Sequence, residues 1–226
     1  CHPNDLQFVL ERASKACISE IMLTAGSVED AEQAQELISS GGYQKSGVKL
    51  YTTTGIHPTR ATQTLRDEPH YMEKLSLLAK SPHVVAIGEC GLDYCRQFST
   101  PQDQITVFTE HFELAKVTRK PMFLHLRDAF DDFYRLVKDH RESFTSGVVH
   151  SFDGTSEQAL QLVDLQLYIG INGCSVKQEE GLSVINAVPL EWLMVESDAP
   201  WCDIRPTHAS SKHIKSVIVK KDKDKW

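Results

Sequence analysis

Four short apolar stretches of the chain are each followed by a histidine or a carboxylate. These residues are Glu89 after residues 84–88 (VVAIG), His125 after residues 121–124 (PMFL), His150 after residues 147–149 (GVV) and Asp198 close behind residues 192–195 (WLMV). A carboxylate at the end of a buried strand is costly unless cations or strong donors face it. Two imidazoles and two carboxylates suit Zn²⁺ or Mn²⁺, and also Mg²⁺ when water completes the shell. The residue types therefore predict a divalent-metal site built by Glu89, His125, His150 and Asp198.

The elements that must position these residues alternate between strand and helix. Strand-like stretches begin near residues 18, 48, 84, 121, 147, 167 and 193. Helical spacing and capping signals predict helices at about residues 5–17, 71–80, 129–139, 155–165 and 179–187, one between Ser27 and Gly41, a long helix from Pro101, and the start of a helix in residues 210–220. This alternation predicts parallel β-α units, either in an open doubly wound sheet or in a closed eight-stranded barrel.

The placement of the polar residues favours the barrel. The candidate ligands end nonadjacent strands around a rim, whereas an open sheet would gather them at one switch point. A closed barrel needs eight strands, but this chain starts with a helix, so the missing strand is the first. We therefore predict an α/β fold, an incomplete (β/α)8 TIM-type barrel, as a single domain over residues 1–226.

The composition narrows the functional classes. Hydrophobic residues make up 41% and charged residues 24% of the chain, which is enough for a core and gives no sign of disorder. The 24 Lys and Arg against 31 Asp and Glu give a net charge of −7, which argues against a protein that coats nucleic acid by bulk electrostatics. The six cysteines include no C-x-x-C pair, so we expect reduced thiols in an intracellular compartment. No segment resembles a signal peptide or a membrane span.

Five segments in chain order resemble the motifs of one family. Residues 88–94 (GECGLDY) resemble the G-E-x-G-L-D-[YF] motif of the TatD family of metal-dependent deoxyribonucleases, and residues 55–58 (GIHP), 125–129 (HLRDA), 150–154 (HSFDG) and 196–201 (ESDAPW) resemble its other motifs. The eukaryotic branch is the most similar. The resemblance implies a metal-dependent hydrolase barrel that cleaves DNA phosphodiesters, as an exonuclease trimming from a 3′ end. The family's first strand, which carries an H-x-H metal pair in many relatives, and its final helix have no counterpart here.

The expected chemistry gives each candidate a role. Phosphodiester hydrolysis needs charge neutralised on the phosphate and a hydroxide at neutral pH, and a divalent ion (Mg²⁺, Zn²⁺ or Mn²⁺, one or two) supplies both. Asp198 is the expected catalytic acceptor of the proton of the attacking water, or serves only as a ligand. Glu89 is the second expected catalytic residue, and the resemblance implies that it bridges two ions in relatives with the H-x-H pair. His57 and Arg127 are expected to bind the substrate phosphate. Their alternatives are a histidine that stabilises the turn before Pro58 and an arginine in a surface ion pair.

Three functions remain open from the sequence. The leading one is a metal-dependent deoxyribonuclease acting on DNA that is single-stranded or has free 3′ ends. The second keeps the barrel and the metal but hydrolyses a small ester or amide. Relatives of that kind often carry a carboxylated Lys on a central strand, where this chain has Glu89. The third is a catalytically silent interaction module, suggested by the missing first strand. We further expect a monomer in the nucleus or cytoplasm without a membrane partner.

Overall fold

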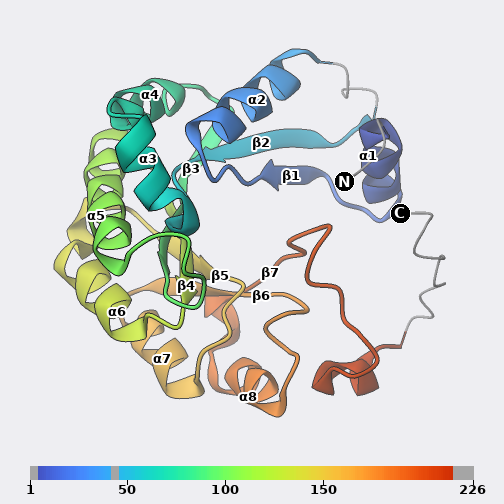
Figure 1. The fold of residues 1–226 in the computed structure, drawn as a ribbon. Coiled ribbons are helices and arrows are strands. Elements are labelled where there is room, and N and C mark those ends of the chain that lie inside the picture. Colours follow the sequence, from blue (N-terminus) through green and yellow to red (C-terminus); the bar gives the residue numbers. More distant parts are fainter. Residues whose placement is uncertain (1–4, 42–45, 216–226) are drawn as a thin grey trace.

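The computed structural model describes residues 5–41 and 46–215, and at its centre lies one parallel sheet of seven strands. The strands pair in chain order from β1 to β7. They are β1 Glu20–Leu23, β2 Lys49–Thr54, β3 Val84–Asp93, β4 Met122–Arg127, β5 Gly147–His150, β6 Leu167–Ile171 and β7 Leu193–Val195. Figure 1 shows the sheet curled, with helices on its outer side. Because parallel strands joined through helices all point the same way, their C-terminal ends share one rim.

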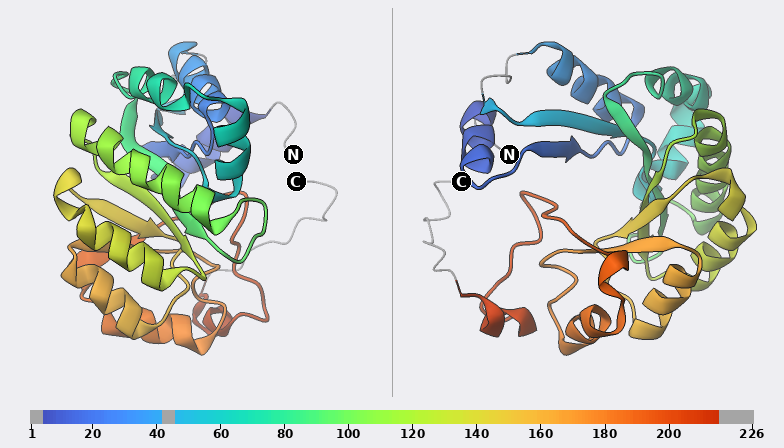
Figure 2. Two further views of the ribbon diagram at one scale, coloured as in Figure 1. Left: turned by 60° about the vertical axis from the view of Figure 1, so that its left-hand side comes forward. Right: turned by 180° about the vertical axis from the view of Figure 1, so that it is seen from behind.

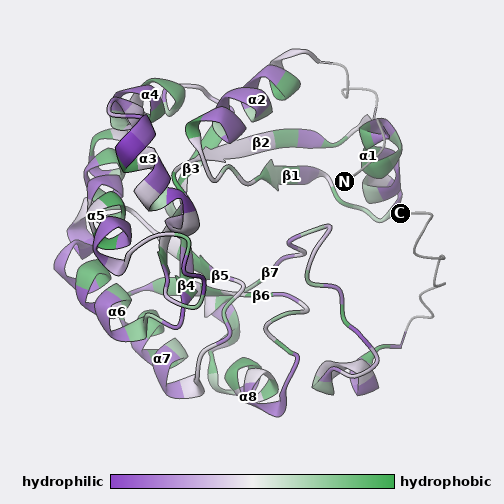
Figure 3. Ribbon diagram, in the orientation of Figure 1, coloured by the Kyte–Doolittle hydropathy of each residue, from purple (hydrophilic) through white to green (hydrophobic). Residues whose placement is uncertain are grey.

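Helices cover the outer face of the curled sheet, as both views in Figure 2 show. They are α2 Val28–Ser39, α3 Ala61–Asp67, α4 Tyr71–Leu78, α5 Pro101–Thr118, α6 Phe130–Asp139, α7 Ser156–Asp164 and α8 Glu179–Ala187. Helix α1 Leu6–Lys15 lies apart from this layer, beside the starts of β1 and β2 (Figure 1). The short 3₁₀ helices are η2 Pro58–Arg60, η3 Arg141–Ser143, η4 Leu190–Trp192 and η5 Ala209–His213. Hydrophilic and hydrophobic residues alternate along these helices (Figure 3). That mixture is expected for a helix that packs one face on a sheet and exposes the other.

The structure confirms the predicted fold class as an incomplete, curled half-barrel. All seven predicted strands are present, and within residues 5–41 and 46–215 the edge strands β1 and β7 do not pair with each other. Helix α3 was not predicted from the sequence. The central strand is longer than predicted, because β3 continues past Glu89 and pairs with β4 as far as Asp93.

The predicted C-terminal helix is replaced where the structure describes it. Residues 209–213 form the 3₁₀ helix η5 and residues 214–215 are not helical, while residues 216–220 of the predicted helix lie outside the described part of the chain. The assignment of residues 1–226 to one domain stays a prediction.

Two further findings concern thiols and membranes. Five cysteines of the described residues are free thiols, at positions 17, 90, 95, 174 and 202. Among the helices that the structure describes, none combines the length and the apolar character needed to cross a membrane.

Helix α5 forms the main packing contact on the central strands. Its N-terminus is set by Thr100, whose side chain caps the helix, and by Pro101 at the first position. Phe108 and Phe112 on its inner face are fully buried, and Phe108 stacks on Phe133 of α6 with ring centroids 5.4 Å apart. Each such ring contributes ~1.5–3 kcal/mol by leaving water. Helix α5 thereby supports β3, which carries Glu89, and α6 packs on β4, which carries His125.

One buried histidine connects α5 to the rim. His111 is fully buried, and its Nε2 accepts a hydrogen bond of 3.0 Å from the Ile56 backbone N–H. Its Nδ1 donates to the Val107 carbonyl oxygen at 2.7 Å. These contacts require the neutral ring with its hydrogen on Nδ1. Because Ile56 precedes His57 in the loop after β2, His111 fixes the backbone from which His57 projects.

We expect His111 to make the stability of the protein pH-dependent. Burial lowers the pKa of His111 to about 4, although the hydrogen bond to Val107 partly opposes this. As the pH falls below about 6.5, His111 binds a proton in the unfolded chain but stays neutral in the folded protein. The stabilisation that neutral His111 gives the folded protein is therefore present above pH 6.5 and is lost as the pH falls toward 4. The loss amounts to ~3 kcal/mol.

Urea unfolding of wild type and His111→Gln at pH 7, 6, 5 and 4 measures this effect. The wild type should be the more stable protein at pH 7, and its advantage should shrink by ~3 kcal/mol by pH 4. A stability difference that stays constant over this range would contradict the prediction.

Candidate metal centre

Three histidines and one carboxylate meet at the C-terminal rim of β2 to β5. His57 follows β2, Glu89 lies in β3, His125 lies near the end of β4 and His150 ends β5. In the sheet, His125 pairs with Gly91 on one side and with His150 on the other. We call His57, Glu89, His125 and His150 the rim cluster.

The Glu89 carboxylate is the shared partner of the three imidazoles. Its Oε1 lies 2.8 Å from Nδ1 of His125, 2.8 Å from Nε2 of His150 and 3.4 Å from Nε2 of His57. The His125 Nδ1 and His150 Nε2 atoms are themselves 3.4 Å apart. The four side chains are between 6% and 14% exposed, so water screens these contacts little.

A bulge in β3 places Glu89 at this point. The pairing of β3 with β4 shifts between Gly88 and Cys90, so Glu89 is the extra residue. Such bulges re-aim a side chain next to a site. The glycines around it let the two strands approach: a Cβ on Gly88 would lie 2.1 Å from the Phe123 carbonyl oxygen, and both Gly88 and Gly91 have positive φ angles.

His125 and His150 each have a second carboxylate on the side away from Glu89. His125 Nε2 is 3.3 Å from Asp93 Oδ2. His150 Nδ1 is 3.6 Å from Glu196 Oε2, which is an ion-pair distance but longer than a hydrogen bond, so this buried nitrogen has no hydrogen-bond partner in the structure. Each ring therefore lies between two acceptors.

His57 differs from the other two histidines in its outer partner. Its Nδ1 accepts a hydrogen bond of 3.1 Å from the Thr59 backbone N–H and lies 2.6 Å from the Thr59 hydroxyl. Because the Nδ1 atom accepts from an N–H group, the ring hydrogen belongs on Nε2, where it points toward Glu89. His57 therefore presents a donor to the centre of the rim cluster.

The charges of the rim cluster follow from these contacts. Burial disfavours the charged Glu89 carboxylate, but hydrogen bonds from the three imidazoles outweigh burial and hold the pKa of Glu89 well below its usual range. Burial also disfavours charged His150, but Glu196 and Glu89 raise the pKa of His150 to about 10. The pKa of His125 is likewise raised, because its two carboxylate partners outweigh the effect of burial.

The donor set fits a divalent metal. Ligand atoms of His57, Glu89 and His125 all lie within 4.8 Å of one another. His150 Nε2 adds a fourth ligand atom on the same carboxylate oxygen, and the orphaned Nδ1 behind it shows a ring that lacks a full set of partners. The nitrogen that His57 turns inward is a donor that its turn holds in place, so Glu89, His125 and His150 suit a metal better than a set that includes His57.

The structure does not join the other two predicted site residues to the rim cluster by any described hydrogen bond or ion pair. Asp198 is exposed in the loop after β7, where its Oδ2 accepts from the Cys202 thiol at 3.4 Å. The sheet does not position it, because β7 ends three residues earlier at Val195. Arg127 is the last residue of β4 and is half-buried, and its charge acts on Asp153 in the next loop.

Sequence reasoning missed Asp93 and Glu196 as site residues. Both lie inside segments that were already singled out, residues 88–94 and residues 196–201. Asp93 is an acidic residue in a fully buried position, and Glu196 directly follows the last strand. The available signal was therefore a second carboxylate in each of the two acidic motifs.

Comparison with known proteins points to one family over nearly the whole chain. The family model described as TatD related DNase matches residues 1–221. Deoxyribonuclease Tat-D of Schizosaccharomyces pombe is 37% identical over 227 residues, which cover 96% of this chain and 70% of that protein. The 3′-5′ ssDNA/RNA exonuclease TatD of Klebsiella pneumoniae is 37% identical over 211 residues, covering 91% of this chain and 77% of that protein.

Solved structures agree with this match. A hydrolase TatD family protein from Entamoeba histolytica superposes with a TM-score of 0.90 at 37% identity, covering 100% of this chain and 75% of that chain. An uncharacterized amidohydrolase from Saccharomyces cerevisiae gives a TM-score of 0.80 at 31% identity over 94% of this chain and 73% of that chain.

We expect metal binding to release protons. With a pKa of about 10, His150 is protonated at neutral pH in protein stripped of metal, and a metal must displace that proton before it can bind. The apparent Kd for Mn²⁺ should therefore fall ~10-fold per pH unit between pH 6 and 8 for each proton released. Titration calorimetry in buffers of different ionisation enthalpy counts the protons. His150→Gln should release about one proton fewer, and an affinity that does not change with pH would contradict the prediction.

Proposed function

The chain belongs to the TatD-related DNase family, and we propose that it is a metal-dependent deoxyribonuclease that hydrolyses phosphodiester bonds, trimming DNA from its 3′ end. The observation that carries this proposal is the shared Glu89 oxygen with imidazole nitrogens at 2.8 Å on both sides. This compact, nearly buried arrangement of carboxylate and imidazole is the donor set that a hydrolytic metal needs. The names of the bacterial and fungal relatives supply the substrate class.

In this proposal Glu89, His125 and His150 hold the divalent ion. When bound, the ion acts as a Lewis acid toward the phosphate and lowers the pKa of bound water. Glu89 contributes a full negative charge, because its pKa is held well below the usual range. The two imidazoles give up their protons to become ligands. Mg²⁺, Mn²⁺ or Zn²⁺, as one ion or two, is compatible with this role.

Asp198 is proposed to accept the proton of the attacking water, or to complete the ligand set. It follows the C-terminal end of β7, and its carboxylate is exposed. Its described partner is the weak thiol donor of Cys202, a contact that is easily exchanged for a stronger one.

His57 and Arg127 are proposed to bind the phosphate that is cleaved or its neighbour. The Nε2 hydrogen of His57 points into the rim cluster, where a phosphate oxygen can accept it. The guanidinium of Arg127, at the end of β4, can donate to two phosphate oxygens at once. Both residues supply donors, which suits an anionic substrate.

The setting of this activity is also part of the proposal. We place the enzyme in the nucleus or cytoplasm, because its described cysteines are free thiols. We propose that it acts as a monomer on single-stranded DNA or on 3′ ends. The preference for single strands and for attack from the 3′ end is taken from the name of the bacterial exonuclease.

The nuclease should depend on the metal, Glu89 and Asp198. A 3′-labelled single-stranded DNA should be trimmed by wild type with Mg²⁺ or Mn²⁺ and left intact after chelation. Glu89→Gln removes a ligand and Asp198→Asn removes a proton acceptor, so each should lower the rate ~10²–10⁴-fold. Asp203→Asn, which changes an exposed carboxylate in the same loop, is the matched control.

Circular single-stranded DNA tests the direction of attack. It has no ends, so an exonuclease leaves it intact while it degrades the linear strand. Cleavage of the circle would overturn the exonuclease assignment, and full activity in both Glu89→Gln and Asp198→Asn would overturn the metal-dependent nuclease.

Arg127 should act on substrate binding. Loss of one charge-assisted contact in Arg127→Ala should lower kcat/KM for single-stranded DNA ~10–100-fold. The slope of log Kd against log salt concentration should fall by ~0.7, because one phosphate contact is lost. Arg135→Ala, which removes an exposed arginine of α6, should leave the slope unchanged. An unchanged slope in Arg127→Ala would contradict a phosphate contact.

A further inference from the structure

The rim cluster is the middle of a longer row of alternating carboxylates and imidazoles. The row runs from Glu196 to His150, Glu89, His125 and Asp93, with successive distances of 3.6, 2.8, 2.8 and 3.3 Å. Each imidazole turns one nitrogen toward the shared carboxylate and the other toward a carboxylate of its own. The outer pair, Asp93 and Glu196, has no part in the reaction described above.

We infer that Asp93 and Glu196 are positioning residues for the metal centre, an inference that rests on the proposed function. An ionised carboxylate can only accept hydrogen bonds, so the imidazole nitrogen that faces it must carry the hydrogen. Asp93 therefore fixes a hydrogen of His125 on Nε2, and Glu196, at an ion-pair distance, favours one of His150 on Nδ1. Glu89 faces the inward nitrogen of each ring, so without a metal that nitrogen carries a hydrogen too. When a metal takes the place of the inward hydrogen, the outer carboxylate would retain the other one, and the inward nitrogen would be the ligand of a more basic ring.

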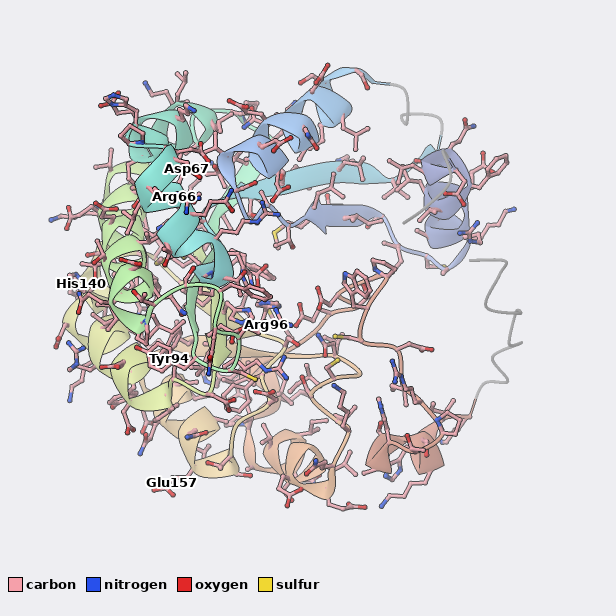
Figure 4. The ribbon with its side chains drawn as sticks, in the orientation of Figure 1. Arg66, Asp67, Tyr94, Arg96, His140 and Glu157 are labelled. Atoms are coloured by element: carbon pink, nitrogen blue, oxygen red, sulfur yellow. The ribbon has the colours of Figure 1, made fainter. Side chains whose placement is uncertain are left out.

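Asp93 is held in place independently of His125. It is fully buried, its Oδ1 accepts a hydrogen bond of 2.9 Å from the Arg96 backbone N–H, and the Arg96 Nε lies 3.7 Å from its Oδ2. Arg96, labelled in Figure 4, belongs to the loop between β3 and α5. The Gln104 side chain on α5 bonds both backbone groups of Asp93, at 2.8 and 2.9 Å. The Asp93 carboxylate is thus held in place by groups other than His125, and it can orient the His125 ring.

Glu196 is anchored in the same way on the opposite side of the row. Its Oε1 accepts from the Ser151 backbone N–H and lies 3.5 Å from the Asn172 side-chain nitrogen, which leaves Oε2 for His150. Gly170 on β6 makes room for it, since a Cβ there would lie 3.2 Å from Glu196 Oε1. The absence of a side chain at Gly170 therefore leaves the Glu196 carboxylate the space to approach His150.

His57 supplies an internal contrast. Its outer nitrogen meets the Thr59 backbone N–H, a donor, at 3.1 Å, so its inward nitrogen carries the hydrogen. The same reasoning that makes His125 and His150 ligands makes His57 a hydrogen-bond donor. The outer partner of each imidazole thus decides its role at the centre.

Metal affinity tests the inference without relying on activity. Calorimetric Kd values for Mn²⁺ and Zn²⁺ should be ~10–100-fold weaker in Asp93→Asn and in Glu196→Gln than in wild type. Two variants serve as controls: Glu191→Gln, an exposed carboxylate shortly before Glu196 in the sequence, and Asp139→Asn, an exposed carboxylate at the end of α6. Both should bind the metals as tightly as wild type does. His57→Gln should change the Kd less than either positioning variant. The melting temperature of each metal-free variant shows whether it is folded.

Nitrogen NMR of the Zn²⁺-loaded wild type gives a measurement that needs no variant. It should show the imidazole hydrogen of His125 on Nε2 and that of His150 on Nδ1. The opposite tautomers, or folded Asp93→Asn and Glu196→Gln that both bind metal as tightly as wild type, would overturn the inference and leave the proposed function standing. A wild type that binds neither metal would overturn both.

Discussion

The structure depends on the burial of one negative charge, the Glu89 carboxylate. An unpaired buried carboxylate is costly, and here the cost is offset by three imidazoles that come from three different strands or their loops. Those partners reach it only if β2 to β5 keep their register at the rim. The bulge at Glu89 and the glycines beside it are local irregularities of β3 that this single contact explains.

Much of the fold and of the rim cluster could be predicted, because the alternation of strands and helices and the polar residues at strand ends can be recognised in the sequence alone. Glu89, His125 and His150 were found in this way, and so was the half-barrel. The outer partners were not found, because the distance from His125 to Asp93, or from His150 to Glu196, depends on pairing register across strands. Helix α3 was missed because its residues 61–67 (ATQTLRD) include only two apolar residues, Ala61 and Leu65, which are too few to reveal a helical period.

His57 shows that two interpretations of one residue need not exclude each other. The sequence left open a histidine that stabilises the turn before Pro58 or one that binds the substrate. The structure gives the ring the first task through Nδ1, which accepts from Thr59, and that contact leaves Nε2 facing Glu89 as a donor. A residue that is anchored by its turn is already oriented before any ligand arrives, and such preorganisation lowers the cost of binding.

The net charge of −7 determines which electrostatic properties the rim needs in order to bind a phosphate. An acidic protein repels a polyanion at long range, so the attraction for a phosphate must be created locally. Glu89 alone would add to the repulsion, but it gathers imidazoles whose pKa values it raises, so that positive charge collects around it. A divalent ion that displaces one proton from each of His125 and His150 would leave the net charge of the row unchanged. Its contribution would be to concentrate that positive charge at one point, where a phosphate oxygen can bind it directly.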